Sequence, residues 1–127
     1  MEVRLLMIFL ACLLSSISNR GGAASCSLDN IVMSQSGTGG WAHGQPEYVV
    51  TVSNTCGCSQ SDVHVACDGF NTTLAVDPSK LRPPSDGGKL CLVNGGEPVV
   101  QGRDVTFSYA WSPQFKFTPV SSNVKCK

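Results

Sequence analysis

Six cysteines within residues 25–127 constrain this chain more than any other feature. They are Cys26, Cys56, Cys58, Cys67, Cys91 and Cys126, and a seventh, Cys12, lies near the N-terminus. An even number of cysteines in an oxidising compartment predicts three disulfides. Such bonds supplement the core of a domain of about 100 residues, which buries less of its surface than a larger one. Several pairings of six cysteines are compatible with the sequence, so the connectivity stays open.

Cys56 and Cys58 impose one local restriction on that connectivity. A single residue, Gly57, separates them. On a strand their side chains would share a face, and a bond between them would be badly strained. We therefore expect each of the two to bond to a different partner.

Residues 1–24 have the pattern of a secretory signal peptide. Arg4 precedes an apolar run at 5–14, and the small residues Gly22-Ala23-Ala24 follow it. The run is shorter than the roughly 20 apolar residues that span a bilayer. We expect cleavage near Ala24 and a secreted domain at 25–127 without membrane insertion. Whether processing occurs near Arg20 stays open.

The expected mature chain is almost neutral. Loss of Glu2, Arg4 and Arg20 leaves seven basic and eight acidic residues, a formal charge of −1. This balance argues against a nucleic-acid partner and against a polybasic membrane anchor.

Alternation of apolar and polar residues after the leader predicts an all-β fold. The expected strands are 31–36, 48–53, 63–67, 89–93 and 105–111, with a final strand that carries Phe115 and Phe117 toward Cys126. On three of them the large side chains share one face: Tyr48, Val50 and Val52; Val63, Val65 and Cys67; Val105, Phe107, Tyr109 and Trp111. The pattern predicts a small, disulfide-stapled antiparallel β-sandwich, with a small barrel as the alternative.

Turn signals separate these strands. We expect Gly37-Thr38-Gly39-Gly40 to close the first strand, and Asn94-Gly95-Gly96 to form a tight hairpin turn. Residues 77–88 are rich in proline and glycine, which predicts an exposed connection that does not pair in a sheet.

No motif predicts catalysis or a bound cofactor. His43 and His64 lack a neighbouring nucleophile, and turn formation explains the acidic residues beside glycine or proline. Cys56, Cys58, Cys67 and His64 could be imagined as a zinc site, but zinc needs thiolates that oxidation removes. We expect no catalytic residues, no metal and no cofactor.

Four surface residues are candidates for modification or binding. Asn71-Thr72-Thr73 is an N-glycosylation sequon, so Asn71 is the expected acceptor. Trp41, Arg82 and Lys89 are candidate partner-binding residues, because tryptophan and arginine are enriched at interface hot spots. For the glycine-flanked Trp41 the alternative is local packing.

A set of short runs resembles the plant tapetum determinant family over nearly the whole of residues 25–127. The residues that carry the resemblance are Gln35-Ser36 with Thr38-Gly39, Gly44 with Pro46-Glu47, Val50, Val52, Asn54, Cys56, Cys58, Gly69-Phe70, Val76-Asp77-Pro78, Cys91-Leu92-Val93-Asn94, Tyr109-Ala110-Trp111, Phe115 and Cys126. One departure is the region before the domain. Family ligands often carry a longer basic segment there, whereas Arg20 alone precedes Gly21-Gly22, which places this chain with a shorter branch.

The resemblance implies a secreted signalling protein of the apoplast, not an enzyme. It implies a monomeric ligand for a leucine-rich-repeat receptor kinase that controls cell fate in the anther tapetum, with the six cysteines as structural disulfides. No receptor-contact residue carries over.

Two other functions stay open. A cell-wall or carbohydrate-binding module would place Trp41, Tyr48 and a further aromatic side chain coplanar on one exposed face, whereas a protein ligand would show a mixed patch with Arg82 or Lys89. A small hydrolase would need a cleft that holds two close carboxylates.

Overall fold

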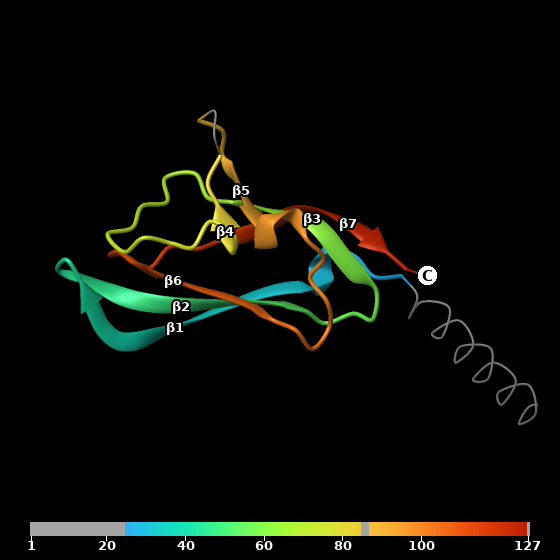
Figure 1. Ribbon diagram of the computed structural model, residues 1–127, viewed down its shortest axis with the longest axis horizontal. Coiled ribbons are helices and arrows are strands. Elements are labelled where there is room, and N and C mark those ends of the chain that lie inside the picture. Colours follow the sequence, from blue (N-terminus) through green and yellow to red (C-terminus); the bar gives the residue numbers. More distant parts are fainter. Residues whose placement is uncertain (1–24, 85–86, 127) are drawn as a thin grey trace, which may run out of the picture.

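The domain is a sandwich of two antiparallel β-sheets (Figure 1). The computed structural model describes residues 25–84 and 87–126, so the expected signal peptide at 1–24 lies outside the described residues. One sheet has three strands in the order β1-β2-β6, and the other has four in the order β4-β5-β3-β7. The predicted β-sandwich is confirmed, and the two sheets do not join into the alternative barrel.

Seven strands and two short 3-10 helices make up the described chain. They are η1 (Leu28–Asn30), β1 (Ile31–Ala42), β2 (Gln45–Asn54), β3 (Ser59–Ala66), β4 (Leu81–Arg82), β5 (Leu90–Val93), η2 (Asn94–Gly96), β6 (Val105–Ala110) and β7 (Thr118–Lys125). No helix in the described ranges is long and apolar enough to cross a membrane.

The first strand is longer than the sequence predicts. β1 and β2 pair from Ile31 opposite Asn54 to Gly37 opposite Tyr48, and pairing resumes at Trp41 opposite Pro46 after a register shift. The glycines therefore form a bulge instead of ending the strand. Gly39 takes a φ of 85°, a conformation that glycine adopts without steric cost, and this lets the extra residues be accommodated.

Part of the segment 77–88 also pairs, contrary to expectation. Leu81 and Arg82 form β4, opposite Val93 and Leu92 of β5. Pro83 follows the pair directly, so no ladder position needs the N–H that proline lacks. Burial of Leu81, which is 2% exposed, stabilises this short edge strand.

The predicted hairpin turn at 94–96 is wrong as well. Asn94, Gly95 and Gly96 all have positive φ values, of 58°, 63° and 85°, and form η2. From there Val99 bridges to Gln60 of β3, still in the four-stranded sheet. The chain then turns at Val100–Arg103 into β6 of the other sheet.

The last expected strand begins later than predicted. β7 starts at Thr118, and Phe115 and Phe117 precede it in an irregular stretch. Both rings pack on Phe70, with centroids 5.3 and 5.1 Å from it. Packing of both rings on this cluster, rather than alternation, sets the path of this stretch.

The core lies between the sheets, on the faces that the sequence predicts. Its members include Val50 and Val52 of β2, Val63 and Val65 of β3, and Phe107 and Tyr109 of β6, all 5% exposed or less. An aromatic cluster forms where β2 begins and β6 ends, and its rings are Tyr48, Phe70, Tyr109, Phe115 and Phe117.

Candidate functional site

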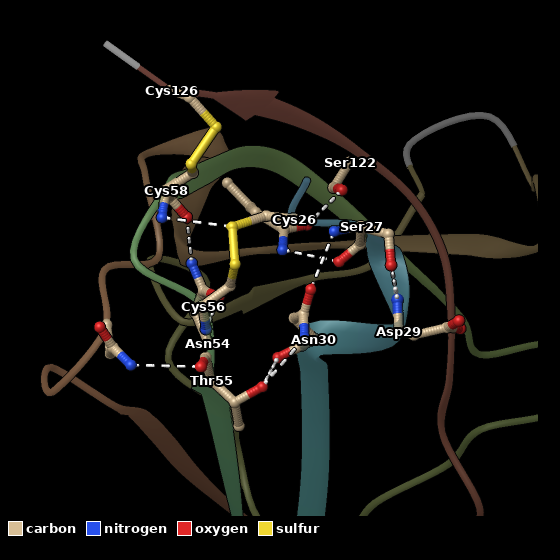
Figure 2. The surroundings of a disulfide bond; sticks show 12 residues. Cys26, Ser27, Asp29, Asn30, Asn54, Thr55, Cys56, Cys58, Ser122 and Cys126 are labelled. Atoms are coloured by element: carbon tan, nitrogen blue, oxygen red, sulfur yellow. Dashed lines mark hydrogen bonds between the residues drawn. A yellow bond between two sulfur atoms is a disulfide. The ribbon is translucent and has the colours of Figure 1, made fainter. Parts of the chain in front are cut away.

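Two disulfides lie side by side at the end of the sandwich where β2 leads into β3 (Figure 2). One joins Cys26 to Cys56 and the other joins Cys58 to Cys126. The backbone N–H of Cys58 donates a hydrogen bond to Cys26 Sγ at 3.4 Å. As expected, Cys56 and Cys58 have different partners. The two bonds tie the segment before β1 and the end of β7 to one loop.

The third disulfide joins Cys67, directly after β3, to Cys91 of the neighbouring strand β5. Cys67 is 7% exposed and Cys91 is 1% exposed, so this bond is part of the core. Its two ends flank the loop 68–89, which carries both the sequon and β4.

Asn54 organises the loop that carries Cys56 and Cys58. Its side chain is buried, and its amide nitrogen donates to the carbonyl oxygens of Cys58 at 2.8 Å and Val99 at 2.9 Å. Its amide oxygen accepts a hydrogen bond from Cys56 N at 3.0 Å. Asn54 is recognisable in the sequence only as a turn signal at a strand end, and its role in holding the loop depends on the fold.

Gln60 holds the segment before β1 and strand β7 together through its side-chain amide. It is fully buried in β3, its Nε2 donates to Ser27 O at 2.8 Å, and its Oε1 accepts from the Ser122 hydroxyl at 2.6 Å. Nothing in the sequence marks it, because Ser59-Gln60-Ser61 contains no apolar residue that would reveal an inward face. Within the described residues, no buried side-chain nitrogen or oxygen lacks a hydrogen-bond partner.

Three sulfur atoms of the two neighbouring disulfides are as close together as the ligands of a metal ion, but they lack the chemistry of metal ligands. Those of Cys26, Cys58 and Cys126 lie within 4.8 Å of one another. Each belongs to a disulfide, and a disulfide sulfur is not the thiolate that zinc requires. Cys67, which the sequence placed in an imagined zinc set, is bonded to Cys91.

Three acidic side chains have structural contacts. Glu47 accepts a hydrogen bond from the Thr38 hydroxyl, and Asp62 accepts one from Asn123. Hydrogen bonds from the backbone and hydroxyl of Ser79 lower the pKa of Asp77.

Neither histidine has a catalytic partner within residues 25–84 and 87–126. His43 is exposed, and the His64 ring lies 3.0 Å from the carbonyl oxygen of Asp62. Among the described residues, no serine hydroxyl hydrogen-bonds to a histidine. The arrangement therefore offers no serine nucleophile with a histidine base.

The candidate binding residues lie on different sheets. Trp41 is in β1 of the three-stranded sheet and is 70% exposed, which argues against a local packing role. Arg82 is exposed in β4, and Lys89 is exposed directly before β5 of the other sheet. The sheets do not place the three residues on a common strand or strand pair.

Tyr48 faces the core and does not join Trp41 on an exposed face. Its ring stacks on Tyr109 at a centroid distance of 5.5 Å and an interplanar angle of 30°. Trp41 and Tyr48 thus do not form the flat exposed platform that a carbohydrate-binding module would use. This finding removes the feature that would have favoured the carbohydrate interpretation.

Tyr109 anchors the aromatic cluster through its hydroxyl, which donates to Gln35 Oε1 at 2.6 Å and accepts from Phe115 N at 2.9 Å. Burial raises the pKa of Tyr109 above its ordinary value. A folded-state pKa above the unfolded one means that this stabilisation is complete below the unfolded pKa and is lost as pH rises through the folded pKa.

We expect Tyr109→Phe to lower the free energy of unfolding at pH 7 by about 2 kcal/mol, because the partly buried Phe115 N–H loses its acceptor. The difference from the wild type should narrow over the alkaline range above the ordinary tyrosine pKa of 10.0, since the folded-state pKa of Tyr109 is raised and the variant has no phenol to ionise. Urea denaturation across this range measures both effects. A difference that stays constant with pH would contradict the assignment.

Comparisons with known proteins now add to this geometry. The family described as "Tapetum determinant 1, C-terminal" matches residues 27–127. The protein named "TPD1 protein homolog 1" of Arabidopsis thaliana is 34% identical over 111 residues, which cover 86% of this chain and 59% of that protein. "TPD1 protein homolog 1B" of Oryza sativa subsp. japonica is 35% identical over 104 residues, which cover 81% and 59%.

The matched region thus spans 59% of the length of each of these two relatives. A further similar protein, uncharacterized and from Arabidopsis thaliana, is 33% identical over 68% of both chains. No solved structure matches this chain.

Proposed function

Because the chain belongs to the tapetum determinant 1 family, we propose that it is a secreted signalling protein and not an enzyme. Its folded domain binds the ectodomain of a leucine-rich-repeat receptor kinase in the plant apoplast. Through that receptor it biases a cell-fate decision in the anther, where the tapetum forms. The family match over 27–127 is the observation that carries this proposal.

The stapled architecture supports a ligand role. Three disulfides and the buried amides of Asn54 and Gln60 fix the loop and both ends of the described chain against the sheets. A preorganised surface loses little conformational entropy when it binds. The domain therefore presents a surface that does not need to fold upon binding.

Trp41 is the strongest candidate for the contact surface. It is the most exposed of the large hydrophobic side chains in the described residues, at 70%. Tryptophan contributes a large apolar area and is enriched at hot spots. Arg82 and Lys89, on the four-stranded sheet, form a second candidate contact.

Binding of the oxidised chain to a panel of leucine-rich-repeat ectodomains tests the proposal. The chain is purified from the medium of a plant expression host, and cell-wall glycans and a fully reduced sample are run in parallel. We expect saturable binding to one ectodomain, lost on reduction. Binding to glycans alone would overturn the ligand role in favour of a carbohydrate-binding module.

We expect Trp41→Ala to weaken binding to that ectodomain by about 30-fold, the size of a typical hot-spot loss of about 2 kcal/mol. Titration by surface plasmon resonance measures the change. Val100→Ala is the matched control, because Val100 is also an exposed apolar residue, at 41%, but lies at the turn that precedes β6. If both variants lose affinity equally, or neither loses any, Trp41 is not the anchor.

A further inference from the structure

An apolar cavity of about 240 Å³ opens beside Asn71, in the loop that follows β3. Phe70, Val76, Leu81 and Pro83 contribute its apolar lining, and Asn71 itself is part of the wall. Sites for drug-sized ligands usually enclose about 300 to 1,000 Å³. The cavity is smaller than that and suits a single sugar ring or a single large side chain.

The side chain of Asn71 is held with its nitrogen free. Its Oδ1 accepts a hydrogen bond from Thr72 N at 2.8 Å, which fixes the amide plane. In the part of the chain that the structure describes, Nδ2 has no hydrogen-bond partner, and the residue is exposed. Nδ2 is the atom to which an N-linked glycan is attached.

The rest of the sequon is fixed to the sandwich. The Thr73 hydroxyl donates to Ala42 O at 2.7 Å, and Thr73 N donates to Ala110 O at 2.9 Å. The Thr72 hydroxyl accepts from Ala110 N at 3.0 Å. These bonds join the loop to the ends of β1 and β6, so a group attached at Asn71 starts from a rigid backbone beside the cavity.

We propose that Asn71 carries an N-linked glycan whose first N-acetylglucosamine occupies this cavity. In its attachment, Nδ2 displaces a lipid pyrophosphate from C1 of the donor oligosaccharide. The N–C1 bond forms, the C1–O bond breaks with its electron pair leaving on the lipid pyrophosphate, and the proton lost from the amide passes to solvent. The chemistry that the cavity recognises is the sugar's apolar C–H face and its acetamido methyl group.

The tether makes the sugar the occupant that the geometry favours. The attachment atom belongs to a residue of the cavity wall, so the sugar is already concentrated there and pays little entropy to enter. The exposed side of Phe70, Val76 and Pro83 offers aromatic and aliphatic surface to its C–H face. The polar Thr72 hydroxyl is already bonded within the loop.

The inference shares the secretory route with the proposed function but is otherwise independent of it. A ligand that reaches the medium without sugar on Asn71 would overturn the glycan and leave the receptor role standing. Conversely, a seated glycan on a protein that binds no receptor ectodomain would leave only the glycan.

The test uses the full chain secreted from a host restricted to high-mannose glycans. Endoglycosidase H then leaves one N-acetylglucosamine on each glycosylated asparagine. We expect the trimmed protein to melt about 4 °C above the Asn71→Gln variant, because the remaining sugar still covers the apolar wall. With isotope-labelled sugar, nuclear Overhauser effects should join the acetamido methyl protons to the Phe70 ring.

A matched control moves the same sugar away from the cavity. Asp104→Asn creates the sequon Asn-Val-Thr with Val105 and Thr106, at an exposed position just before β6. In the double variant Asn71→Gln, Asp104→Asn the trimmed sugar should give no comparable rise in melting temperature over Asn71→Gln alone.

Three outcomes would overturn the inference. The first is a secreted chain that mass spectrometry finds unmodified at Asn71. The second is a trimmed glycoform that melts with the Asn71→Gln variant and lacks contacts to Phe70. The third is an equal rise from the sugar at the control position, which would mark a generic effect of glycosylation.

Discussion

Replacing Cys58 and Cys126 together by alanine is expected to lower the free energy of unfolding by about 4 kcal/mol. The bond closes a loop with a sequence separation of 68 residues. In the chain-entropy description, a loop of that length restricts the unfolded chain by roughly this amount. Both cysteines must be replaced, because a single free thiol would lie close to Cys26 and could exchange with its disulfide. Urea denaturation of the secreted protein measures the loss.

The Cys67–Cys91 bond provides the matched control. Its sequence separation is 24 residues, so the same description predicts a smaller loss of about 3 kcal/mol when both cysteines become alanine. Small domains are typically stable by only about 5 to 15 kcal/mol, so either loss is a large share. Equal losses, or a larger loss at Cys67 and Cys91, would show that burial of the bond outweighs the length of its loop.

The size of the disulfide contributions determines how the reduced sample in the receptor-binding experiment is interpreted. A fully reduced chain loses all three constraints, and their sum is comparable with the whole stability of a small domain. Loss of receptor binding on reduction therefore reports loss of the folded surface. The Cys58 and Cys126 double variant separates loss of a disulfide from loss of the folded surface. At low temperature this variant should stay folded and retain affinity for the receptor.

The strands and their inward faces could be predicted because the signal is local. Val63 and Val65 alternate along β3, Cys67 directly after the strand continues the alternation, and each is buried as the alternation predicts. The same holds for Val50 and Val52 of β2. A side chain's direction on a strand depends on position parity alone, so neighbours in sequence suffice.

Features that depend on distant parts of the chain could not be predicted. Gln60 is buried because Ser27 and Ser122 converge on it, and neither lies near it in sequence. Leu81 pairs because β5 offers an open edge. The sequence alone predicts an exposed side chain for Gln60, because glutamine is usually exposed. It predicts no strand at Leu81, because a proline-rich segment usually does not pair in a sheet.

The candidate binding residues show the same limit. The sequence identified Trp41, Arg82 and Lys89 by residue type and by their flanking glycines and prolines, and all three are exposed. It could not show that Trp41 belongs to the other sheet, or that Tyr48 turns inward to stack on Tyr109. Composition predicts exposure, whereas only the fold determines which exposed side chains share a surface.

Asn54→Leu should destabilise the domain about as much as loss of a disulfide. Leucine has the same branched side-chain shape as asparagine but carries methyl groups in place of the amide oxygen and nitrogen, so the carbonyls of Cys58 and Val99 and the N–H of Cys56 all lose their partner. Each buried group left unsatisfied costs about 1 to 3 kcal/mol, and we expect a total near 4 kcal/mol. Denaturation in urea, with the disulfides intact by mass spectrometry, measures it.

Asn54→Asp separates the hydrogen bonds from the packing. The carboxylate still accepts from Cys56 N, but it faces the two carbonyl oxygens and can donate only when it is protonated. Its folded-state pKa should therefore lie above the unfolded value. The variant should be destabilised least, relative to the wild type, at acid pH. The destabilisation should grow as pH rises through the folded-state pKa of the new carboxyl group. If the penalty does not change with pH, Asn54 acts by filling space, and its amide nitrogen does not hold the end of β2 to Cys58 and Val99.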